Sequence, residues 1–101
     1  MSCGKGNIEQ PVQNELVLIE FWTNWCLYSR LLRPKLSLIC ERYRGRVDVV
    51  RVDADTERHF ANKLGVEYIP ALVLLREGEV VGKWYGDLPL QAITEALDAH
   101  V

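Results

Sequence analysis

The sequence predicts an α/β protein whose central mixed β-sheet is flanked by helices on both faces. Three observations predict this fold class. The apolar run at residues 16–22 shows no alternation, which is typical of a strand buried on both faces. Helical periodicity follows it, and a β-branched run then returns to a strand pattern. Strands joined through a helix and followed by a hairpin give a sheet with a parallel part and an antiparallel edge.

Length and composition set the class of protein. The chain has 101 residues, so we expect one domain spanning 1–101, with a loose polar lead-in over residues 1–15. A formal net charge of -2 does not form the basic footprint of a nucleic-acid-binding domain. The apolar runs are too short for a bilayer, and the three cysteines follow no disulfide framework. We therefore expect a monomeric, cytoplasmic protein without nucleic-acid or membrane partners.

The segment at residues 27–43 is predicted to be an amphipathic helix. Its apolar residues recur at spacings of four, three and four, at Leu32, Leu36, Ile39 and Tyr43. Pro34 inside the helix should kink it, and Gly45 marks its end. The β-branched run at residues 47–53 is then predicted to be the second strand.

The second half of the chain is predicted to hold a short helix, a hairpin and a last helix. Asp55 or Thr56 can cap the short helix, which would run to Leu64. Strands at 71–75 and 80–84 would pair about the connection Glu77-Gly78-Glu79. The last helix would begin at Pro89, with Leu90, Ile93 and Leu97 on its apolar face. The predicted order is βαβαββα.

Cys26 lies at the junction between the first strand and the long helix. The first turn of a helix presents unpaired backbone N–H groups and the positive end of the helix dipole. Both stabilise a thiolate, which is the reactive form of cysteine. The position alone makes Cys26 a candidate nucleophile.

A set of short motifs extends from about residue 15 to the end of the chain. Its members are Phe21-Trp22, Trp25-Cys26, Pro34, Val52-Asp53-Ala54-Asp55, Ile69-Pro70, Glu77-Gly78-Glu79 and Gly86. In this order and at these spacings, the set resembles the thioredoxin family. The resemblance implies a thioredoxin fold with an abbreviated N-terminus and a thiol–disulfide oxidoreductase that acts on protein disulfides without a cofactor. It also implies a reductant of the thioredoxin-reductase type or glutathione.

The active-site motif departs from the family pattern Trp-Cys-Gly-Pro-Cys, because Ser29 stands where the second cysteine is expected. Cys26 can attack a substrate disulfide, but an alcohol cannot resolve the mixed disulfide. Ser29 can still donate a hydrogen bond to the Cys26 sulfur. Cys40 lies fourteen positions further along, roughly 20 Å away in a continuous helix, and disulfides need Cα atoms within about 7 Å. We expect Cys40 to be a small buried hydrophobe, and Cys3 lies in the polar lead-in.

Glu20 interrupts the apolar first strand, where an isolated carboxylate is strongly disfavoured. The resemblance implies that Glu20 assists proton transfer during resolution and that Arg51 is its basic partner. The alternative is a structural ion pair or an acid at the rim of the sheet. An acid that serves an absent thiol suggests that Ser29 replaces a cysteine, naturally or by engineering.

The remaining site residues are predicted to bind the substrate or to support the site. The resemblance implies a cis Ile69–Pro70 bond opposite Cys26, with Trp22 as a supporting core residue. Trp25, Leu27, Tyr28, Ile69 and Pro70, together with Tyr68, would form an apolar docking rim. No metal ligand set is expected. Two alternative functions remain: a non-redox binding or adaptor module that uses this rim, and a glutathione-dependent monothiol oxidoreductase.

Overall fold

A computed structural model describes residues 14–101 of the chain. Most of the predicted lead-in and Cys3 therefore lie outside the described residues. The elements are β1 (Leu16–Trp22), α1 (Leu27–Arg42), β2 (Val47–Asp53), α2 (Arg58–Lys63), β3 (Ala71–Arg76), β4 (Glu79–Tyr85) and α3 (Leu90–Asp98). The predicted order βαβαββα is confirmed. Among residues 14–101, no helix combines the length and the apolar character needed to cross a membrane.

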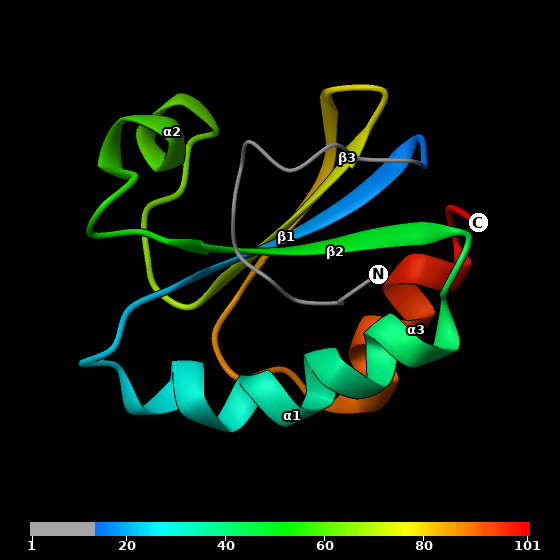
Figure 1. The fold of residues 1–101 in the computed structure, drawn as a ribbon, viewed down its shortest axis with the longest axis horizontal. Coiled ribbons are helices and arrows are strands. Elements are labelled where there is room, and N and C mark those ends of the chain that lie inside the picture. Colours follow the sequence, from blue (N-terminus) through cyan, green and yellow to red (C-terminus); the bar gives the residue numbers. More distant parts are fainter. Residues whose placement is uncertain (1–13) are drawn as a thin grey trace.

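The four described strands form one mixed sheet in the order β2-β1-β3-β4. β1 runs parallel to β2 and antiparallel to β3, and β4 pairs antiparallel with β3 at one edge. Helices α1 and α3 lie against one face of the sheet, and α2 lies on the other, near one end of the strands (Figure 1). The structure thus has the α/β arrangement that the sequence predicts, with β1 between two neighbouring strands.

Side-chain alternation along the strands divides the core into two clusters. Leu16 and Leu18 pack with α1 and α3, whereas Ile19 and Phe21 pack on the side of α2. The apolar positions predicted for α1 are all buried in the first cluster: Leu32, Leu36, Ile39 and Tyr43. The same alternation puts Glu20 on the face that α1 covers.

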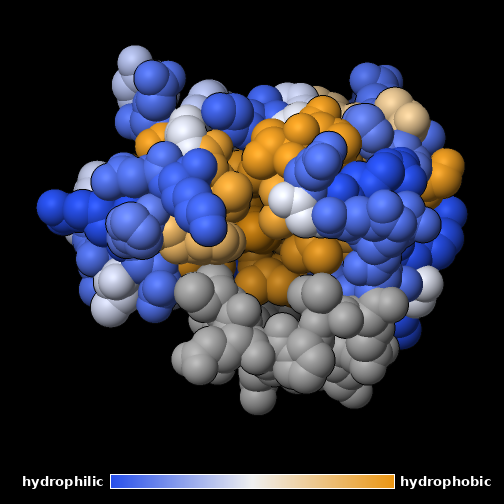
Figure 2. Space-filling model, turned by 90° about the horizontal axis from the view of Figure 1, so that it is seen from above, coloured by the Kyte–Doolittle hydropathy of each residue, from blue (hydrophilic) through white to orange (hydrophobic). Residues whose placement is uncertain are grey.

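The face of the sheet that carries α2 has a visible hydrophobic surface. Figure 2 shows this face as a hydrophobic band between hydrophilic groups. Val17 and Leu75 are among the partly buried residues that pack against the second cluster on this side. Because α2 has only six residues, it covers one end of the sheet (Figure 1).

The start of α2 differs from the prediction. The helix begins at Arg58, and neither Asp55 nor Thr56 caps it. Instead, Asp53 Oδ1 accepts hydrogen bonds from the backbone N–H groups of Asp55, at 2.9 Å, and Thr56, at 3.4 Å. These bonds hold the residues after β2 in a turn, so the helix starts later.

The hairpin between β3 and β4 is tighter than predicted. Its two turn residues, Glu77 and Gly78, both have positive φ, at 49° and 85°. Positive φ at both central positions is typical of a type I′ turn, whose twist matches that of the flanking strands. Glu79 therefore belongs to β4 instead of the connection.

Candidate active site

Cys26 occupies the N-cap position of α1, in extended backbone conformation immediately before the helix begins at Leu27. The first turn of α1 contains no acidic residue, and no side chain caps it. The backbone N–H groups of this turn therefore face no competing carboxylate of the same turn and no capping side chain. The Cys26 side chain is only 8% exposed. Cys26 thus lies at the junction of strand and helix, where the sequence places it.

The peptide bond between Ile69 and Pro70 is cis, as the resemblance implies. The Cys26 thiol donates a weak hydrogen bond to the Ile69 carbonyl oxygen, with 3.8 Å between sulfur and oxygen. Gly86 N–H donates to the Pro70 carbonyl at 2.9 Å and holds the loop from the other side. The loop before β3 therefore lies beside the sulfur, although the two segments are 43 positions apart.

Ser29 lies in the first turn of α1 and is buried, with 1% of its surface exposed. Its Oγ accepts a hydrogen bond from Thr23 N–H at 3.4 Å. In the part of the chain that the structure describes, Ser29 makes no hydrogen bond to the Cys26 sulfur. The serine thus ties the loop after β1 to the helix, and the bond to sulfur that the sequence permits is not formed.

Glu20 and Arg51 are register partners on β1 and β2 and lie on the face under α1. Arg51 Nε donates to Glu20 Oε1 at 2.8 Å, whereas Glu20 Oε2 has no hydrogen-bond partner within residues 14–101. Glu20 is completely buried. Burial raises the pKa of Glu20 above its ordinary value, and the charges of Arg51 and Arg33 oppose this only in part. Desolvation therefore outweighs the lowering of this pKa by Arg51.

Three aromatic and apolar side chains of the predicted rim lie within two positions of Cys26 in the sequence and face solvent. Trp25 is 69% exposed, and Leu27 and Tyr28 are also exposed. Tyr68 stands exposed on the loop before β3, beside the half-buried Ile69 and the buried Pro70. Such a cluster of exposed apolar residues is unusual unless it serves an interaction.

Trp25 is held by a contact that the sequence did not indicate. Its indole Nε1 donates to Asp55 Oδ2 at 2.8 Å. Asp55, predicted to cap α2, thus fixes an aromatic residue of the rim instead. No local pattern signals a pair thirty positions apart; only the parallel pairing of β1 with β2 brings these two loops together.

Trp22 is half-buried and lies against two guanidinium groups. Arg51 Cζ is 4.7 Å and Arg33 Cζ is 5.8 Å from the centre of its ring. The predicted supporting role of Trp22 therefore includes Arg33, which was not among the predicted site residues. The spacing of Arg33, Leu36 and Cys40 by three and four was the available signal, because it places Arg33 on the helix side that borders the sheet.

Cys40 is buried among core residues, as expected. Its expected role as a simple hydrophobe is nevertheless wrong, because it is disulfide-bonded. Among residues 14–101, Cys26 is the free cysteine. No cluster of three or more His, Cys, Asp or Glu side chains in this part of the chain is arranged to hold a metal ion.

The free cysteine thus lies at a helix N-terminus, beside a cis-proline loop on a mixed sheet, which is the arrangement that the resemblance implies. Comparison with known proteins agrees: the Thioredoxin family model matches residues 2–99. A thioredoxin of Staphylococcus haemolyticus is 32% identical over 95 residues, which cover 94% of this chain and 91% of that protein. A thioredoxin of Staphylococcus aureus is 30% identical with the same coverage.

Solved structures give the same result. A mutant thioredoxin from Halobacterium salinarum superposes with a TM-score of 0.80 at 28% identity, over 86% of this chain and 75% of that one. The chain belongs to the thioredoxin family. The family and the site place it in the class of thiol–disulfide oxidoreductases.

Proposed function

We propose that this protein attacks protein disulfides through Cys26 and accumulates mixed disulfides because Ser29 occupies the resolving position. One observation carries the proposal. The free thiol lies at the uncapped start of α1 and against the Ile69 carbonyl, and the residue one turn later is an alcohol.

The first step is a thiol–disulfide exchange. The Cys26 thiolate attacks one sulfur of the substrate disulfide, a new S–S bond forms, and the other sulfur leaves as a thiolate with the bonding electron pair. The leaving thiolate then takes a proton. An external thiol such as glutathione must attack the mixed disulfide to release the substrate sulfur and regenerate Cys26.

Glu20 is proposed to store the proton in this site. A buried carboxyl with a raised pKa holds a proton at a higher pH than an exposed one does. Glu20 also lies on the sheet face covered by α1, which is the helix that carries the active-site residues. The exposed rim of Trp25, Leu27 and Tyr28 would receive the substrate polypeptide.

Insulin reduction by dithiothreitol tests the proposal. We expect Ser29→Cys to raise the turnover rate on the order of ten-fold or more, because an intramolecular thiol resolves at a high effective concentration. Cys26→Ala is the matched control and should abolish catalysis in both backgrounds. Equal rates for the protein and Ser29→Cys would contradict the assignment of position 29.

The exposed rim also supports a second candidate, a non-redox binding module. Alkylation of Cys26 by iodoacetamide near neutral pH separates the two functions. A rate no faster than that of a model thiol would favour the binding module. A stable glutathione adduct on Cys26 that excess glutathione removes would instead indicate the glutathione-dependent monothiol enzyme.

A further inference from the structure

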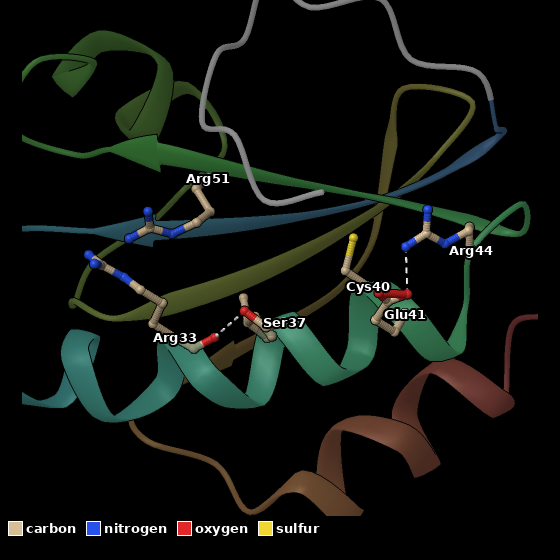
Figure 3. Close-up of a pocket in the computed structure, with 7 residues that line it drawn as sticks. Arg33, Ser37, Cys40, Glu41, Arg44 and Arg51 are labelled. Carbon is tan, nitrogen blue, oxygen red and sulfur yellow. Dashed lines mark hydrogen bonds and ion pairs between the residues drawn. The ribbon is translucent and has the colours of Figure 1, made fainter. Parts of the chain in front are cut away.

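A cleft of about 410 Å³ runs between α1 and β2, and arginines dominate its lining. Arg33 comes from α1, Arg51 from β2 and Arg44 from the connection between them, whereas Glu41 supplies the one carboxylate of the lining within residues 14–101 (Figure 3). Figure 3 shows the guanidinium groups of Arg33 and Arg51 pointing the same way, toward the end of α1 where Cys26 lies. The cleft therefore presents two converging cations on the side of the redox site.

The positive charge of this pair is incompletely neutralised. Arg44 forms an exposed ion pair with Glu41, and Arg51 Nε is paired with Glu20. Within residues 14–101, Arg33 forms no ion pair, and the buried Nη2 atom of Arg51 has no hydrogen-bond partner. Hydrogen bonds between guanidinium and carboxylate groups are charge-assisted and strong, so the incompletely neutralised charge of Arg33 and Arg51 favours an incoming anion.

Arg51 is held in place before a ligand arrives, whereas Arg33 is exposed on α1. Both lie against the ring of Trp22, and the hydrogen bond to Glu20 fixes the orientation of Arg51. Planar guanidinium groups match the geometry of a carboxylate, which can accept two parallel hydrogen bonds. Preorganised donors bind with a smaller loss of side-chain entropy than free ones.

The distance from Cys26 selects the kind of ligand. Arg33 follows Cys26 by seven positions, which is roughly 10 Å along the axis of α1. Three residues of an extended polypeptide span about 10 Å. A carboxylate on the substrate chain therefore reaches the arginines when it lies about three residues from the cysteine under attack.

We propose, on the basis of the proposed function, that Arg33 and Arg51 form a carboxylate subsite. It takes an Asp or Glu side chain about three residues from the reactive cysteine of an extended protein substrate. Cys26 attacks the substrate sulfur at the rim, while the carboxylate is bound in the cleft. The subsite thus selects among disulfides by the charge near them.

Synthetic peptides test the subsite. Each carries one cysteine as a mixed disulfide with thionitrobenzoate, and glutamate or glutamine stands three residues from it on either side. Attack by Cys26 on the peptide sulfur forms the Cys26–peptide disulfide and releases thionitrobenzoate, whose absorbance gives the rate. Of the two peptides with glutamate three residues before or after the cysteine, we expect the better-placed one to react roughly five-fold faster than its glutamine counterpart at low ionic strength. High salt should reduce this difference in rate, because it screens the charges.

The ratio of the glutamate to the glutamine rate is the readout for the variants. Arg33→Gln should bring the ratio close to one, and Arg33→Lys should keep part of it. Arg30→Gln is the matched control, because it removes an exposed charge of α1 that is nearer to Cys26 and should leave most of the ratio. A peptide with glutamate next to the cysteine should show little acceleration.

Two outcomes would overturn the subsite. Equal acceleration by glutamate at both positions, or an equal loss in Arg30→Gln and Arg33→Gln, would assign the effect to the general positive field of α1. Equal rates for all peptides would show that the carboxylate is not bound. If no peptide forms an adduct with Cys26, the proposed function itself fails, and the subsite fails with it.

Discussion

Glu20 shows how its surroundings set the charge state of one residue. It lies in the middle of the sheet, completely buried, with one oxygen bound to Arg51 and the other without a partner among residues 14–101. Burial disfavours the ionised form, whereas the guanidinium favours it. The pKa of Glu20 is raised above its ordinary value, so burial has the larger effect.

The raised pKa of Glu20 predicts a pH dependence of stability. A carboxyl whose pKa is higher in the folded state stabilises the fold at low pH, and this stabilisation is lost as the pH rises through the folded pKa. Glu20→Gln should remove that loss, so the variant should gain stability relative to the natural chain as the pH rises above about 4.5. Urea unfolding across this range measures the difference in free energy.

A matched control is available for this pH dependence. Glu79→Gln removes an exposed carboxyl at the start of β4 and should leave the pH profile nearly unchanged. Identical slopes for Glu20→Gln and the natural chain would show that Glu20 ionises as easily in the folded state as in the unfolded state.

The residues of the site were predictable to different degrees. Cys26, Ser29 and the Ile69–Pro70 bond follow from local motifs and a family resemblance, and the structure brings them together. The contact of Trp22 with Arg33 was not predicted, because it depends on how α1 packs over the end of β1. Local sequence shows that both residues are present, but it does not show this packing.

At the scale of elements, α1 combines a buried face with an exposed apolar face. Ile39 is completely buried, whereas its neighbour Leu38 is 58% exposed. Ile39→Ala should destabilise the fold by about 2–5 kcal/mol, because it deletes buried methyl groups and leaves a cavity. Leu38→Ala should change stability by less than about 0.5 kcal/mol.

Urea unfolding followed by circular dichroism compares the two variants of α1. The difference between them isolates burial, because both changes place alanine in the same helix. Equal losses for the two variants would mean that Leu38 is covered in solution or that α1 packs differently.

Element boundaries were predictable where the signal is local. β1 and β2 match the predicted strands because continuous apolar or β-branched runs define both ends. The start of α2 was missed because Asp53 holds the preceding turn, while Asp55 is recruited by Trp25 from another loop. Competing partners for the same side chain decide such boundaries, and a single sequence does not rank them.

At the scale of the molecule, one sheet separates two core clusters, and adjacent residues of β3 contribute to different ones. Val73 packs on the side of α2 and Leu74 on the side of α1, and both are fully buried. The fold class was predictable because alternation and element order determine which faces need covering. The lengths of the helices that cover these faces, such as the six residues of α2, were less predictable.

A sheet shared by both clusters predicts a single cooperative unfolding transition. Leu74→Ala should cost about 2–5 kcal/mol and Val73→Ala less, and both should lower the midpoint of the same transition. Tryptophan fluorescence and far-ultraviolet circular dichroism should give coincident curves for each variant. Separate transitions in Val73→Ala would show that the side with α2 unfolds independently.

The pairing of Glu20 with Arg51 has a consequence for how this chain can change length during evolution. A strand reverses its faces at every residue, so a one-residue insertion between Leu16 and Glu20 would turn either the core residues or the acid to the wrong side. Insertions in the hairpin turn at Glu77 and Gly78 would leave that parity intact. We therefore expect natural length variation to accumulate at the hairpin turn, while the distance from Leu16 to Cys26 stays constant.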